Sequence, residues 1–286
     1  MSLSRSFVSA VICACALTAA LRAQGKLAID RLALHQYEDG PILASGYEFL
    51  PGETGYFSCR IAGFQAKKNA DDQRSVTLSW QARVVDPAGV LLEKPQSGRI
   101  EERLQPEDKE WRPKFLMAFE VPPFAPGGDY RIPVLVKDEL AGAEVGGELV
   151  FHVRRPAVEP ADSLLVRGFR FTGSEDDATE LRPAVYRPGS VLWARFEIAG
   201  HTLGEGNRYS VAYGLAILDA AGKQVFAQPE AASEAHASFY PRRVVPGALS
   251  LTLDPNVPRG EYTMVVTVRD QIGMQVSELK EGFRIQ

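Results

Sequence analysis

Apolar and polar residues alternate with a period of two along most of the chain. From Val76 to Val84 every second residue is apolar, and polar side chains such as Thr77 and Gln81 lie between them. The runs 57–61, 194–198 and 209–217 repeat this pattern. Such alternation indicates strands with one buried face. No long stretch has a helical period, and the Pro- and Gly-rich stretches DPAG, APGG, VPGA and NVPRG mark turns. The pattern predicts an all-β protein.

The alternating pattern occurs in two copies along the chain. GDYRIPVLVKD at residues 128–138 corresponds to GEYTMVVTVRD at residues 260–270, 132 positions later. Pro51-Gly52 recurs as Pro188-Gly189 at an offset of 137, and VVDPAG at 84–89 corresponds to ILDAAG at 217–222 at an offset of 133. Matches in the same order, with an offset that drifts only slightly, indicate two copies of one domain.

The first residues have the pattern of a secretory signal peptide. Arg5 precedes the apolar run FVSAVICACALTAAL, and the small residue Ala23 follows it. The run is shorter than the roughly 20 residues that a membrane-spanning helix needs, and no second run of that length follows. We therefore expect cleavage near Ala23, no membrane span, and a periplasmic or extracellular mature chain.

Each copy has the features of a β-sandwich. The Gly-acid-Tyr segments that contain Tyr130 and Tyr262 resemble the tyrosine corner of immunoglobulin-like domains, and Trp80 and Tyr213 stand where such domains place a core aromatic. The chain thus resembles tandem bacterial immunoglobulin-like, fibronectin-III-like or macroglobulin-like modules, although it lacks their paired core cysteines. The resemblance implies two tandem antiparallel immunoglobulin-like β-sandwich domains. We predict a signal peptide at 1–23, a first domain at 24–155, a linker at 156–163 and a second domain at 164–286.

The sequence offers little chemistry. It contains no GxSxG, HExxH, GxxxxGK[ST], GxGxxG or CxxC motif, and its four histidines have no metal-ligand spacing, so we predict no enzyme, cofactor or metal. Cleavage leaves Cys59 as the one cysteine, expected in the core and without an intramolecular disulfide partner. It also removes two arginines, which leaves 30 basic against 36 acidic residues, a formal charge of −6. That balance argues against a nucleic-acid partner.

Three aromatic residues are candidates for ligand or partner contacts. Tyr56 and Trp193 alternate away from core positions, and Trp111 lies beside Arg112-Pro113; packing under loops or between the domains is the alternative for each. The stretch SFYPRR at 238–243 is expected to pack at an edge or under a loop. Our first hypothesis is a non-catalytic protein-binding or scaffolding module of the cell envelope. The alternatives are a carbohydrate-binding module, a proteinase inhibitor, and an enzyme with an unrecognised site.

Overall fold

The computed structural model describes residues 26–286 except 69–72, 156–160, 175 and 178. Within these residues the chain forms strands β1 to β17 and one turn of 3-10 helix, Glu205–Asn207, so the all-β prediction is confirmed. The predicted signal peptide and the first five residues of the predicted linker lie outside the described residues. No helix among those described is long and apolar enough to cross a membrane. We refer to residues 26–155 as the N-terminal half and to residues 161–286 as the C-terminal half.

The N-terminal half contains two sheets that face each other. One has the order β1-β3-β7, and the other has the order β2-β9-β8-β5-β4, with β6 also paired to β5. The strands are β1 (Ala28–His35), β2 (Glu48–Phe49), β3 (Thr54–Ala62), β4 (Lys67–Lys68), β5 (Arg74–Ala82), β6 (Gln96–Leu104), β7 (Lys114–Glu120), β8 (Gly128–Asp138) and β9 (Ala143–Val153).

The C-terminal half repeats this plan. Its sheets have the orders β10-β12-β15 and β11-β17-β16-β13-β14, so each strand except β4 has a counterpart in the other half. Pairing is antiparallel throughout, apart from the two-residue contacts of β2 with β9 and of β11 with β17. The strands are β10 (Leu165–Thr172), β11 (Val185–Tyr186), β12 (Val191–Ala199), β13 (Tyr209–Leu218), β14 (Gln224–His236), β15 (Val244–Thr252), β16 (Gly260–Asp270) and β17 (Gln275–Ile285).

A hydrophobic core lies between the two sheets of each half. The alternating residues found in the sequence supply it: Phe57, Cys59 and Ile61 of β3 are almost completely buried. In the C-terminal core Tyr213 is buried and meets the ring of Phe196 edge-on. Trp80, the predicted core aromatic of the first copy, is half-buried at the margin of its core, where it stacks on Phe115 with ring centroids 4.0 Å apart.

The segment that occurs twice in the sequence forms β8 and β16, and both of its ends are tied down. At the start, the Oη of Tyr130 donates a hydrogen bond to the carbonyl of Pro126 at 2.7 Å, and Tyr262 does the same to Pro258 at 2.7 Å. At the end, the buried carboxylate of Asp270 accepts hydrogen bonds from three backbone N–H groups. Asp138 has the equivalent three bonds in the first copy. The repeated residues therefore anchor a central strand to the loops at both ends of its sandwich.

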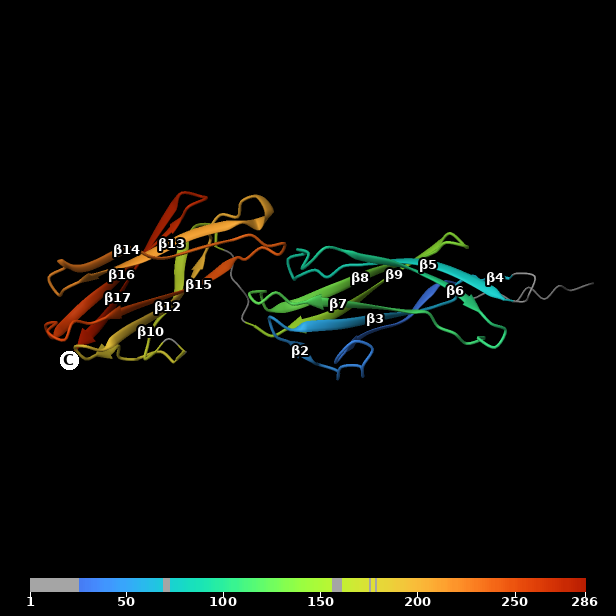
Figure 1. Ribbon diagram of the computed structural model, residues 1–286, viewed down its shortest axis with the longest axis horizontal. Helices are drawn as coiled ribbons and strands as arrows, with labels where there is room; N and C mark the ends of the chain where they lie inside the picture. The colour runs from blue at the N-terminus through green and yellow to red at the C-terminus, as the bar shows by residue number, and fades with distance from the viewer. Residues whose placement is uncertain (1–25, 69–72, 156–160, 175, 178) are drawn as a thin grey trace, which may run out of the picture.

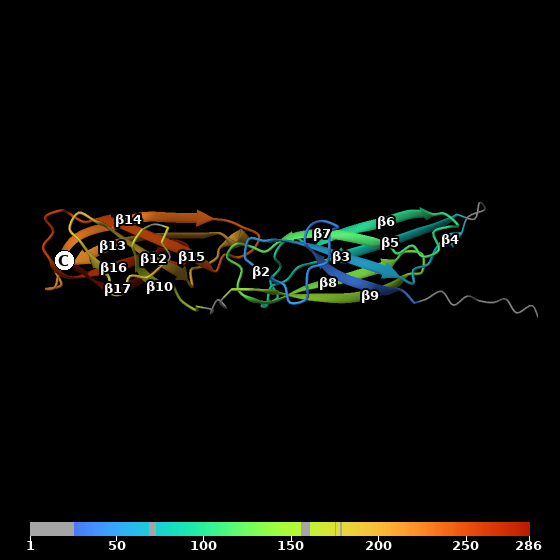
Figure 2. The same cartoon turned by 90° about the horizontal axis from the view of Figure 1, so that it is seen from below.

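The two halves lie end to end along the long axis of the molecule (Figure 1). The same extended arrangement is visible after a turn of 90° (Figure 2), so it is not an effect of one view. The C-terminus lies at the end farthest from the N-terminal half (Figure 1). The region between the halves is therefore the place where side chains of both copies can form a shared site.

Candidate functional site

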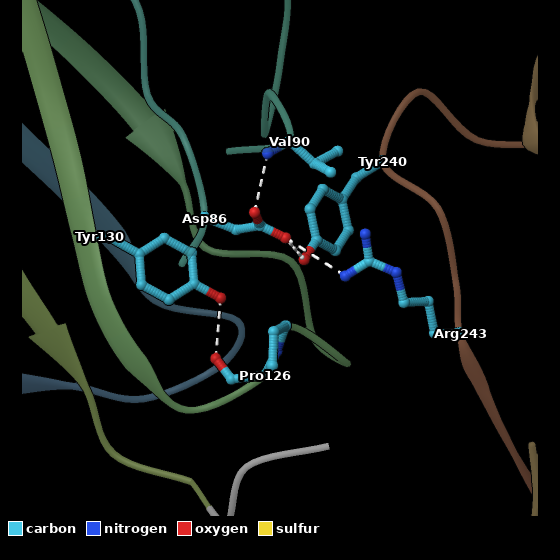
Figure 3. A network of polar contacts seen from close by, with 6 residues as sticks. All are labelled: Asp86, Val90, Pro126, Tyr130, Tyr240 and Arg243. Carbon is cyan, nitrogen blue, oxygen red and sulfur yellow. Dashed lines mark hydrogen bonds and ion pairs between the residues drawn. The ribbon is translucent and has the colours of Figure 1, made fainter. Parts of the chain in front are cut away.

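A buried carboxylate lies at the junction of the two halves. Asp86 belongs to the turn that follows β5, and it is 0% exposed. Its Oδ1 accepts a hydrogen bond from the backbone N–H of Val90 at 2.8 Å. Its Oδ2 accepts one from the Oη of Tyr240 at 2.8 Å and lies 3.4 Å from Nη1 of Arg243. Figure 3 shows this network, in which Tyr240 and Arg243 reach Asp86 from the C-terminal half.

Tyr240 crosses the junction and becomes part of the opposite core. Tyr240 is 8% exposed and packs within the hydrophobic core of the N-terminal half. All the other buried residues of that core come from the N-terminal half of the sequence. Burial raises the pKa of Tyr240 well above its ordinary value, and the nearby Tyr130 and Asp86 raise it further. The phenol therefore stays protonated at physiological pH, and it can always donate its hydrogen bond to Asp86.

The equivalent aspartate of the second copy shows what the junction adds. Asp219 occupies the same place in the turn after β13, and its Oδ1 accepts hydrogen bonds from the N–H groups of Ala221 and Lys223, each at 2.9 Å. The bond to Lys223 matches the bond from Asp86 to Val90, since both span four residues. The turn of Asp219 is exposed, whereas the second oxygen of Asp86 binds the other half. One local turn residue thus has an additional long-range role in the first copy only.

A second contact crosses the junction beside the carboxylate. The guanidinium of Arg242 lies over the ring of Phe124, which belongs to the N-terminal half, at 4.3 Å from the ring centroid. Nη1 of Arg242 also contacts the Oη of Tyr209 at 3.0 Å, so its position is fixed from the C-terminal side. Arg155 approaches the same Phe124 ring at 6.0 Å. Cation–π contacts of this kind contribute about 0.5–2 kcal/mol, depending on desolvation.

A pocket of about 550 Å³ opens between the halves next to these contacts. Its walls come from the loops at 87–88, 124–127, 199–203 and 240–243, together with Ala161. His201 lies in the wall: its Nε2 donates to the carbonyl of Arg242 at 2.8 Å, while its buried Nδ1 has no hydrogen-bond partner among the described residues. Burial lowers the pKa of His201, so its ring is neutral near pH 7.

The predicted contact residues lie in three separate places, each half-buried. Tyr56 lies on β3 and borders a small pocket, whereas Trp193 lies on β12 with its carbonyl 3.4 Å from the Oη of Tyr186. Trp111 precedes β7 and meets the ring of Phe64 edge-on at the margin of the N-terminal core. Neither tryptophan borders the junction pocket. The structure therefore does not bring the three residues together, and their role as contacts remains a prediction.

The junction residues were not identified from the sequence, although both segments that form the contact, VVDPAG and SFYPRR, were noted there. VVDPAG was recognised as a repeat element, and SFYPRR was assigned to edge or loop packing. Tyr240 of this stretch is buried, and it packs in the core of the other half. The three or more His, Cys, Asp or Glu side chains that a metal needs do not gather anywhere in the described part of the chain. The junction has the composition of a binding interface, with an aromatic anchor, a buried charge and arginines.

Comparisons with known proteins give limited information. No protein-family model matches the chain, and no curated protein matches it. Among solved structures, the C-terminal domain of the Streptococcus pyogenes antigen I/II-family protein AspA is 9% identical with a TM-score of 0.29, over 92% of this chain and 99% of that chain. The C-terminal domain of the Streptococcus agalactiae AgI/II polypeptide BspA is 12% identical with a TM-score of 0.28, over 89% of this chain and 99% of that chain. TM-scores this low support no inference about fold or function.

Proposed function

We propose that the protein is an exported, non-catalytic scaffold of the cell envelope, in which two β-sandwich domains form a single rod that binds another protein. The domains are residues 24–155 and 164–286, joined by the linker at 156–163, and residues 1–23 are the cleaved signal peptide. The observation that carries the proposal is the contact of Tyr240 and Arg243 with the buried Asp86.

This contact gives the two domains a defined relative orientation. Tandem domains joined by a short linker move independently unless their interface is large or specific. Here an aromatic side chain of one domain is buried in the core of the other, and its hydroxyl is bound to a fully buried carboxylate. Rotation at the junction would withdraw Tyr240 and Arg243 from Oδ2 of Asp86, while Oδ1 keeps its bond to the Val90 N–H within the turn. Loss of the partners of a buried polar group costs about 1–3 kcal/mol. A rod of fixed geometry is what a spacer or scaffold requires.

The second domain also presents a strand edge that a partner protein can pair with. β14 is the last strand of its five-stranded sheet, most of its residues are exposed, and Val225 is 54% exposed. Its counterpart β6 carries Arg99, Glu101, Glu102 and Arg103 along the edge, whereas residues 224–229 of β14 carry no charge. Charged residues protect strand edges against pairing, and β14 lacks this protection over its first half. An extended segment of a partner protein would add to β14 by backbone hydrogen bonding.

Affinity capture with the tagged mature chain tests this function. The bait is incubated with the envelope fraction of the source cells, and bound proteins are quantified by mass spectrometry. We expect one stoichiometric partner with the wild type, and its loss with Val225→Lys, which places a charge on the edge of β14. Val276→Lys is the matched control, because Val276 is 62% exposed on β17 and away from that edge. Equal capture by both variants contradicts the role of β14, and no stoichiometric partner for the wild type contradicts protein binding.

The structure does not favour the carbohydrate-binding alternative. Sugar-binding surfaces stack rings on exposed aromatic faces, and the three residues proposed for that role are half-buried on separate elements.

A further inference from the structure

We propose that the pocket between the two domains is a binding site for a small organic anion with an apolar body, such as a fatty acid or an aromatic carboxylate. The proposal goes beyond the scaffold function, because it assigns a ligand site to the junction itself. Its volume of about 550 Å³ lies within the range of small-molecule pockets, and such pockets occur preferentially at domain interfaces.

The charges around the pocket favour an anion. Three guanidinium groups, those of Arg155, Arg242 and Arg243, lie at the junction. They face two carboxylates, that of Asp86 and that of Asp270, which bonds to the N–H of Thr202 behind the pocket wall. The chain as a whole carries a net negative charge of −4, so this local excess of positive charge departs from the composition of the protein. Among the residues that line the pocket, Arg243 carries a charge, and a charge in a low-dielectric cleft attracts ligands of the opposite sign.

Arg243 is the group that is placed to bind the anion. It lines the pocket, and its side chain is 40% exposed although one Nη atom contacts the fully buried Asp86. A guanidinium carries five N–H donors in a planar fork, so it can pair with Asp86 on one side and with a ligand carboxylate on the other. Arg242, in contrast, is held over Phe124 and against Tyr209.

The rest of the wall is apolar and suits a hydrocarbon or aromatic body. It contains Pro87 and Phe124 from the first domain, and Leu203 and Pro241 from the second. Because both domains contribute, an occupant would contact both of them at once. Ligand binding would then stabilise the junction in the orientation that the structure shows.

Substitutions of the two members of the ion pair should change the affinity for the anion in opposite directions. Asp86 competes with a ligand anion for Arg243, so Asp86→Asn should tighten anion binding. Arg243→Gln removes the recognition group and should weaken it. If the substitutions acted by opening the junction instead, both variants would bind the anion more weakly, because both break the same ion pair.

The test uses two dyes with the same ring system in the presence of the mature chain. 8-Anilinonaphthalene-1-sulfonate is the anionic dye, and N-phenyl-1-naphthylamine is the neutral control. Fluorescence titration of the wild type should show saturable binding of one anionic dye per chain. We expect about tenfold weaker binding in Arg243→Gln and a several-fold tightening in Asp86→Asn, the size expected for a charge-assisted hydrogen bond. The affinity for the neutral dye should change in neither variant.

Asp219→Asn is the matched control variant, because it alters the equivalent turn away from the pocket, and it should leave both dyes unaffected. Displacement of the anionic dye by dodecanoate or by indole-3-acetate then distinguishes an aliphatic from an aromatic carboxylate. The proposal is overturned if the wild type shows no saturable binding, if both junction variants weaken binding of both dyes, or if neither variant changes the anionic dye. None of these results bears on capture of a protein partner at β14.

Discussion

Replacing Asp86 by alanine should destabilise the protein much more than the same change at Asp219. Both substitutions remove an aspartate that bonds to the N–H group four residues later in an equivalent turn. Only the first also removes the acceptor of Tyr240 and the counter-ion of Arg243. The comparison between the two variants therefore separates the contact between the halves from the cost of disturbing the turn, in which Asp219 also accepts a bond from the N–H of Ala221.

The expected magnitude follows from the contacts. In Asp86→Ala, the lost bond to Val90 accounts for about 1 kcal/mol, and the buried hydroxyl of Tyr240 left without a partner accounts for about 1–3 kcal/mol. The pair with Arg243 adds little, because that side chain is 40% exposed and water can solvate it. In Asp219→Ala, water replaces the lost acceptor on an exposed turn, so the loss should be about 1 kcal/mol. We expect a difference of about 2 kcal/mol between the variants.

Urea unfolding of residues 24–286 at pH 7, followed by far-ultraviolet circular dichroism, measures both losses. Tyr240→Phe is the second arm, and the double variant Asp86→Ala with Tyr240→Phe should lose less than the sum of the two single variants, since both remove the same hydrogen bond. Equal losses for Asp86→Ala and Asp219→Ala, or full additivity in the double variant, would refute the claim that this contact holds the domains together.

Three further predictions concern the cores and the repeated strand. Cys59 is 0% exposed and burial raises the pKa of its thiol to about 12, so it should react with a disulfide reagent such as Ellman's only after unfolding; rapid reaction of the native chain would contradict its burial. At Asp270, burial raises the pKa but backbone hydrogen bonds lower it more, so the net pKa lies below its ordinary value and the carboxylate contributes stability that is complete above about pH 5 and lost as the pH falls below about 4. The stability difference between wild type and Asp270→Asn should therefore shrink in acid, and a difference unchanged down to pH 2 would exclude this role. Gly247→Ala should cost about 1–3 kcal/mol, because its new methyl group would lie 2.2 Å from the Phe196 ring, whereas Gly282→Ala, with its nearest neighbour at 3.9 Å, should cost little; equal effects in thermal unfolding would contradict the close packing.

Local pattern was sufficient to predict the strands. The alternation in GDYRIPVLVKD and GEYTMVVTVRD predicted one inward face, and the structure forms β8 and β16 over those same residues. The bond from each tyrosine back to the chain reaches a neighbour four residues away, so it too is a local property. Side-chain period and turn residues determine features of this range, and for that reason the sequence alone can reveal them.

The junction could not be predicted in the same way. VVDPAG and ILDAAG are equivalent by local criteria, and the two aspartates differ only because one end of the first sandwich faces the second. The contact between Asp86 and Tyr240 spans 154 residues, and it depends on how the two halves of the chain are placed. The outward aromatic positions have a related limit: alternation predicts which face a side chain lies on, but not whether a loop covers that face. Trp111, packed against Phe64, is an example.

A distance distribution across the junction reports on the relative orientation of the two halves without perturbing the contact itself. Spin labels on cysteines introduced at the exposed Ser97 and Ser233, one in each domain, can be measured by double electron–electron resonance while the buried Cys59 remains unlabelled. We expect one narrow distance distribution in the wild-type background, which persists in Asp219→Ala and broadens in Asp86→Ala. A broad distribution already present in the wild-type background would contradict a rod of fixed geometry.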